Sequence, residues 1–87
     1  MYEYSYEETL KYSSILKSTY EVLIHHKNSG LWPVQFRWDL GTKLNLDEDK
    51  LLQRYEFKLI KEGWIIQIRA GELIRPSEKL INRYLNR

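Results

Sequence analysis

Apolar residues recur every three or four positions along most of the chain, which is the spacing of one buried face of a helix. The pattern is clearest where Phe36, Leu40 and Leu44 follow one another at four-residue steps. Gly30 suits a left-handed cap at the end of the first such segment, and Pro33 suits the first position of the second. The spacing predicts helices over residues 6–27, 33–44, 47–61 and 78–86.

A different pattern occupies residues 64–75. Residues 64–69, Trp-Ile-Ile-Gln-Ile-Arg, are rich in β-branched and aromatic side chains, which favours a strand. Gly63 ends the third helix immediately before this segment. Ala70-Gly71 predicts a tight turn, so the segment is expected to form a two-stranded hairpin.

The residues between the second and third helices have the chemistry of a tight interhelical turn. Gly41 has no side chain at a point where two crossing helices approach closely. Asn45 tolerates the left-handed conformation that a turn of three or four residues needs. Asp47 is a suitable cap for the next helix. Together they predict a helix-turn-helix, whose second helix commonly enters the major groove of DNA.

The order of three helices, a hairpin and a last helix resembles the winged variant of the helix-turn-helix over residues 10–87. The sequence Asp-Leu-Gly-Thr-Lys-Leu-Asn-Leu at residues 39–46 is similar to helix two and its turn in that superfamily. Residues 59–65 resemble the passage from recognition helix to wing. Residues 74–79 resemble the junction from wing to final helix in MarR-like and PadR-like regulators.

This resemblance implies an α+β fold in a single domain over residues 1–87, with a three-helix core, a two-stranded β wing over residues 64–75 and a C-terminal helix. It also implies a transcriptional regulator that binds double-stranded DNA, with residues 47–61 as the recognition helix. Regulators of this kind are typically homodimers, and we expect the first and last helices to form the interface.

The third helix departs from the superfamily at two places. Glu56 stands where a buried apolar residue is usual, so Tyr55 or Phe57 must fill that place, or the helix is rotated. Residues 47–49 are Asp-Glu-Asp, where many relatives carry Ser, Thr or basic residues. Acids stabilise a helix N-terminus through the macrodipole, but they oppose contact with phosphates.

Three side chains of the third helix are the expected contacts to base edges. Gln53 suits adenine and Arg54 suits guanine through paired hydrogen bonds, and Lys50 lies beside them by helical spacing. Contacts to the DNA backbone are expected from Arg37, Lys43, Lys58, Arg69 and Arg75. The alternative interpretation of the third helix is a solvated face with Glu–Lys pairing.

Composition narrows the function only slightly. The 87 residues are 43% hydrophobic and 30% charged, which fits a globular protein, and the net charge of +2 is weak support for nucleic-acid binding. There is no cysteine and no apolar run of about 18 residues, so no disulfide and no membrane span are expected. The start of the chain lacks the pattern of a signal peptide, so an intracellular location is expected.

No pattern predicts an enzyme, a cofactor or a metal site. His25 and His26 are adjacent, so on a helix they point about 100° apart and do not form a metal-binding pair. Two functions stay open: sequence-specific binding of duplex DNA by a small regulator, and a winged-helix adaptor that binds proteins instead. The low net charge and the acidic start of the third helix favour the adaptor.

Overall fold

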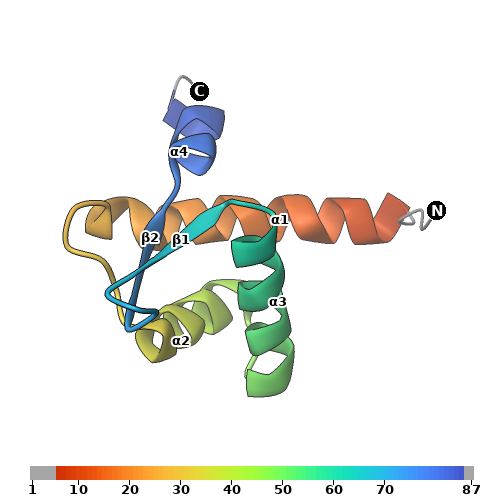
Figure 1. Cartoon of the computed structure of the whole chain (residues 1–87). Helices are drawn as coiled ribbons and strands as arrows, with labels where there is room; N and C mark the ends of the chain where they lie inside the picture. The colour runs from red at the N-terminus through yellow and green to blue at the C-terminus, as the bar shows by residue number, and fades with distance from the viewer. Residues whose placement is uncertain (1–5, 86–87) are drawn as a thin grey trace.

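A computed structural model of the chain describes residues 6–85, with side chains from residue 11 onwards. Over this range the protein is a small α+β domain of four α-helices and one two-stranded antiparallel sheet (Figure 1). The elements are α1 Tyr6–Leu23, the 3-10 helix η1 Ile24–His26, α2 Pro33–Leu44, α3 Asp49–Lys61, β1 Ile65–Ile68, β2 Leu73–Pro76 and α4 Glu78–Leu85. This order is compatible with a winged-helix layout.

The first predicted helix ends in a tighter turn than expected. The α-helical part stops at Leu23, and η1 continues it to His26. Gly30 has φ +82° and donates its N–H to the carbonyl of His26 at 2.8 Å, so it is the left-handed cap that the sequence predicts. Leu31 then exchanges two backbone hydrogen bonds with Ile74, at 2.8 and 2.9 Å, and joins the edge of the hairpin.

The turn between α2 and α3 has the two features expected of it. Asn45 is left-handed, with φ 54° and ψ 49°. The N–H of Leu46 donates to the carbonyl of Gly41 at 2.8 Å. A Cβ at Gly41 would lie 2.5 Å from the oxygen of Leu46, which is closer than Cβ atoms tolerate. The absence of a side chain at Gly41 therefore lets the turn fold back onto α2.

The start of α3 differs from the prediction. The helix begins at Asp49 and not at residue 47, because Glu48 is still extended, with φ −87° and ψ 100°. Glu48 occupies the cap position without a side-chain hydrogen bond, so Asp47 does not cap the helix. Residues 46–48 connect the end of α2 to the start of α3, and helical geometry begins after them, at Asp49.

The loop of the hairpin is also longer than predicted. Strand pairing ends at the pair Ile68 and Leu73, so the loop has the four residues 69–72 in place of a two-residue turn at Ala70-Gly71. Arg69, Ala70 and Gly71 all have positive φ, at 51°, 55° and 88°. Two consecutive non-glycine residues in this region are uncommon, and sequence patterns do not anticipate them.

The core lies where α1, α2, α3 and the hairpin meet. Its fully buried members come from all four α-helices and from β2, and include Leu23, Phe36, Leu40, Leu59, Ile74 and Leu80. Ser77 caps α4, because its hydroxyl accepts the N–H of Leu80 at 3.2 Å. Figure 1 shows α4 on the side of α1 that is opposite to α2 and α3, so the outer sides of α2 and α3 are not covered by α4.

Candidate nucleic-acid interface

The exposed side of α3 carries a single line of four residues, which we call the α3 row: Lys50, Arg54, Phe57 and Lys61. Steps of four, three and four residues place them on one side of a helix. All four are exposed, and Phe57 is 69% exposed. The row extends about 16 Å at 1.5 Å per residue, roughly the rise of five base pairs at 3.4 Å each.

Two of the three expected base contacts, Lys50 and Arg54, belong to the α3 row. The third, Gln53, does not, and the row includes Phe57 as well. Phe57 does not replace the apolar residue missing at Glu56, because Phe57 points to solvent. Gln53 is exposed too, but its amide donates to Asp49 Oδ2 at 2.6 Å, four residues earlier. Lys50 and Arg54 are therefore the predicted residues with the most open access to a ligand.

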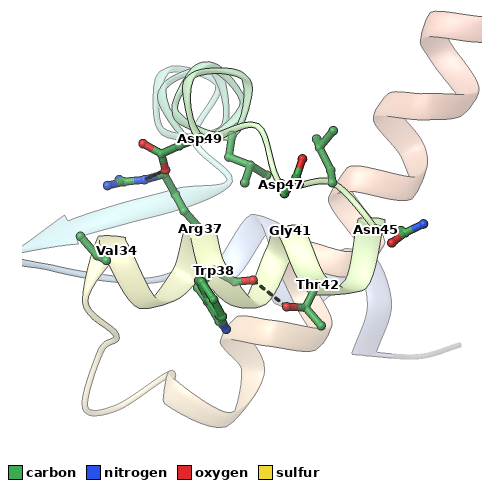
Figure 2. A pocket seen from close by; sticks show the side chains of 10 residues that line it. Val34, Arg37, Trp38, Gly41, Thr42, Asn45, Asp47 and Asp49 are labelled. Atoms are coloured by element: carbon green, nitrogen blue, oxygen red, sulfur yellow. Dashed lines mark hydrogen bonds and ion pairs between the residues drawn. The ribbon is translucent and has the colours of Figure 1, made fainter.

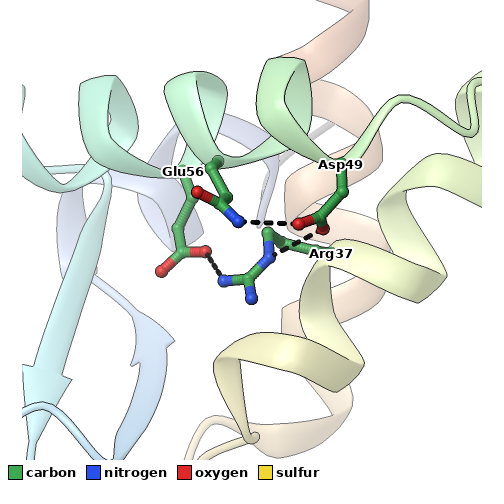
Figure 3. A network of polar contacts seen from close by, with 4 residues as sticks. Arg37, Asp49 and Glu56 are labelled. Carbon is green, nitrogen blue, oxygen red and sulfur yellow. Dashed lines mark hydrogen bonds and ion pairs between the residues drawn. The ribbon is translucent and has the colours of Figure 1, made fainter.

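The half-buried Glu56 is explained by an ion pair with α2. Its Oε1 accepts a hydrogen bond from Nη1 of Arg37 at 2.6 Å, and the two side chains are 13% and 17% exposed. Nε of Arg37 also donates to Oδ1 of Asp49 at 3.3 Å. Figure 3 shows the guanidinium between the two carboxylates, where α2 crosses α3. Arg37, expected to contact the DNA backbone, is thus held by two acids.

Electrostatics at Arg37 favour the ion pair. Burial opposes the charged guanidinium, but the hydrogen bonds and negative charges of Glu56 and Asp49 outweigh this effect, so the pKa of Arg37 is raised. The same contact turns Asp49 toward α2. Because successive residues of a helix point about 100° apart, the carboxylate of Asp49 does not share the side of Lys50. The acidic start of α3 is therefore partly neutralised within the protein.

The remaining expected phosphate contacts are dispersed. Lys58 is half-buried, with its Nζ 4.6 Å from the ring centre of Tyr12 on α1. Lys43, Arg69 and Arg75 are exposed. Figure 1 shows the hairpin loop near the start of α2 and α3 on the other side of α2, so the structure does not bring Arg69 beside the α3 row.

A groove runs between α2 and the start of α3, and we call it the α2 groove. It has a volume of about 650 Å³ and is lined by Val34, Arg37, Trp38, Gly41, Thr42, Asn45, Leu46, Asp47, Asp49 and Leu52. Figure 2 shows Val34, Trp38 and Thr42 along α2, with Asp47 and Asp49 on the opposite side. Trp38 is 73% and Val34 69% exposed, and Trp32 just before α2 is 63% exposed.

Sequence patterns anticipate the exposure of Trp38, which falls off the apolar stripe of α2, but not that of Phe57, Val34 or Trp32. Helical spacing from Lys50 and Arg54 was the available signal for Phe57 and Lys61. No comparable signal identifies the groove, because it depends on how α3 crosses α2. Among residues with described side chains, Leu85 is the sole large exposed apolar residue of α1 and α4, so these residues give little support to the dimer interface expected at the first and last helices.

Comparison with protein-family models, curated proteins and solved structures finds no match to this chain. Within residues 6–85, no helix is long and apolar enough to cross a membrane. The same residues contain no cluster of three or more His, Cys, Asp or Glu side chains placed to hold a metal ion. The functional assignment therefore depends on the geometry of α2, α3 and the turn that joins them.

Proposed function

We propose that this protein binds double-stranded DNA, with α3 in the major groove, as a small transcriptional regulator of the winged-helix type. The observation that carries the proposal is the α3 row, in which Lys50, Arg54 and Lys61 are exposed on one side of α3, the second of two helices joined by a tight turn. Arg54 lies at the middle of the helix, where a guanidinium is best placed to donate two hydrogen bonds to guanine.

Phe57 fits the same proposal. It lies between Arg54 and Lys61 on the row and is 69% exposed. Apolar side chains discriminate thymine by contact with its methyl group in the major groove. The proposed site therefore reads a guanine through Arg54 beside a thymine through Phe57, and Lys43, Lys50 and Lys61 hold the backbone. Binding in this mode requires no second copy of the chain at the first and last helices.

Salt dependence tests the proposal. Each phosphate contact contributes about −0.9 to the slope of log affinity against log salt, so three contacts predict a fall of roughly 40-fold between about 50 and 200 mM salt. The measurement is fluorescence anisotropy with a pool of random-sequence duplexes. Lys50→Ala/Lys61→Ala should make the slope of log affinity against log salt less steep, by the contribution of about two phosphate contacts. Lys17→Ala/Lys27→Ala, which removes two exposed lysines outside α3, is the control and should leave it unchanged.

The second candidate function is a winged-helix adaptor that binds protein. It is favoured by the exposed Trp32, Val34 and Trp38, because exposed tryptophans are common anchors of protein interfaces. Absence of any binding to the duplex pool at low salt would exclude the DNA-binding proposal and leave the adaptor.

A further inference from the structure

Among residues with described side chains, four of the five large exposed apolar residues lie on α2 and α3 or directly before α2. Val34 and Trp38 line the α2 groove, Trp32 directly precedes α2, and Phe57 is on the α3 row. The core does not need them, since Phe36, Leu40, Leu52 and Leu59 fill the contacts of α2 and α3 with the rest of the protein. Large exposed apolar side chains grouped in this way indicate an interaction surface.

The two surfaces have opposite charge. The acids that line the α2 groove are Asp47 and Asp49, and both are exposed. The one cation in the lining, Arg37, is shared between Asp49 and Glu56. The side of the groove at the start of α3 is therefore acidic, in a protein whose net charge is +2. On the α3 row, Phe57 stands between Arg54 and Lys61. An apolar group flanked by cations is the chemical complement of an apolar groove bordered by carboxylates.

We propose that the occupant of the α2 groove is the α3 row of a second copy of this chain. The apolar ring of Phe57 lies against Val34 and Trp38 of the partner copy, and Arg54 and Lys61 meet the groove acids at positions 47 and 49. A two-fold axis makes both exchanges at once, so the dimer is closed. This inference does not depend on DNA binding, but it uses the same row, so a duplex and a second copy compete for α3.

Sedimentation velocity of the full chain without DNA, from micromolar to millimolar concentration, tests the proposal. The expected result is a monomer that converts to a dimer and to nothing larger. Trp38→Ala and Phe57→Ala should each weaken the dimer at least about tenfold. Leu85→Ala is the matched control, because Leu85 is also exposed, at 59%, but lies on α4. It should leave the dimer unchanged.

Charge exchange makes the test specific. Arg54→Glu and Asp47→Lys should each weaken the dimer about tenfold, and the double variant should restore most of the loss, because opposite charges again face one another. All these side chains are exposed, and circular dichroism verifies that each variant folds. A monomer at every concentration, larger assemblies, a Trp38→Ala dimer as tight as wild type, or no rescue in the double variant would each overturn the proposal.

The two proposals fail separately. Trp38→Ala keeps the whole α3 row, so it should retain DNA binding at protein concentrations where wild type is monomeric. Loss of the dimer with retained DNA affinity supports both proposals. A dimer that responds to Trp38 and Phe57 in a protein with no affinity for duplexes supports the dimer alone.

Discussion

At the scale of single residues, Gly41 determines how closely α3 crosses α2. A Cβ there would lie 2.5 Å from the oxygen of Leu46 and 3.0 Å from Cδ1 of Leu52. The oxygen is backbone and cannot move without shifting the turn. We expect Gly41→Ala to lower the free energy of unfolding by about 1–3 kcal/mol, the range for an overpacked contact. Urea denaturation measures the change.

The control for this substitution is Lys43→Ala, because Lys43 is exposed on the same helix and its truncation creates no clash. It should change stability by less than about 0.5 kcal/mol. Equal stability of Gly41→Ala and wild type would contradict the close approach of the turn to Gly41.

The ion pair between Arg37 and Glu56 is a second residue-scale feature with a measurable effect. Arg37→Met leaves the carboxylate of Glu56, 13% exposed, without its guanidinium. We expect a loss of about 1–3 kcal/mol, because a half-buried acceptor loses a charge-assisted hydrogen bond. The double variant Arg37→Met/Glu56→Met should lose less than the sum of the single changes, since replacing both partners removes the unpaired charge.

A double-mutant cycle by chemical denaturation gives the coupling between the two positions. Additive losses would mean that the pair contributes nothing beyond the packing of each side chain. In that case Asp49, at 3.3 Å from Nε of Arg37, would be the more important partner.

At the scale of elements, substitutions on α3 test the DNA-binding proposal most directly. Arg54→Ala should weaken specific DNA binding by about 1–3 kcal/mol and relax the preference at one base pair. Arg75→Ala is an informative comparison, because Arg75 is an exposed arginine on the hairpin and not on the α3 row. It should have a smaller effect. Binding-site selection followed by anisotropy measures both. An equal effect of the two substitutions would mean that the DNA-binding site extends from α3 to the hairpin.

The same element shows how far sequence patterns predict this structure. Asn45, Gly41 and the range of α2 are predictable because each follows from local chemistry: a left-handed residue, a missing side chain, and a proline at the first helical position. The sequence does not predict which side of α3 faces the core, because apolar residues are distributed around much of the helix. Phe57 is exposed and Glu56 is half-buried, and Arg37 of another helix supplies the charge that compensates Glu56.

In the candidate site too, features set by local chemistry are predictable from the sequence, and features set by contacts between elements are not. Helical spacing is sufficient to predict that Lys50 and Arg54 share a side of α3. It does not predict that Asp49 turns to Arg37, that Lys58 packs against Tyr12, or that the hairpin loop takes four residues. Each of these depends on contacts between elements, or on backbone conformations that the residue types disfavour.

At the scale of the whole molecule, the two proposals are linked, because both use the α3 row. If a second copy and a duplex exclude each other from the row, each must lower the affinity of the protein for the other by the same factor. Adding duplex DNA should therefore dissociate the dimer into complexes with one protein per site. Sedimentation with a labelled duplex, detected at a wavelength where only the label absorbs, measures the mass of the complex.

The monomeric variant Trp38→Ala gives the reciprocal measurement. At high protein concentration it should bind DNA more tightly than wild type, because no dimer must dissociate first, and at low concentration the two should be equal. A wild-type complex with two copies on a single site, or a Trp38→Ala protein with weaker DNA binding at all concentrations, would contradict the competition. The second result would instead make Trp38 itself, at the outer side of α2, part of the surface that contacts DNA.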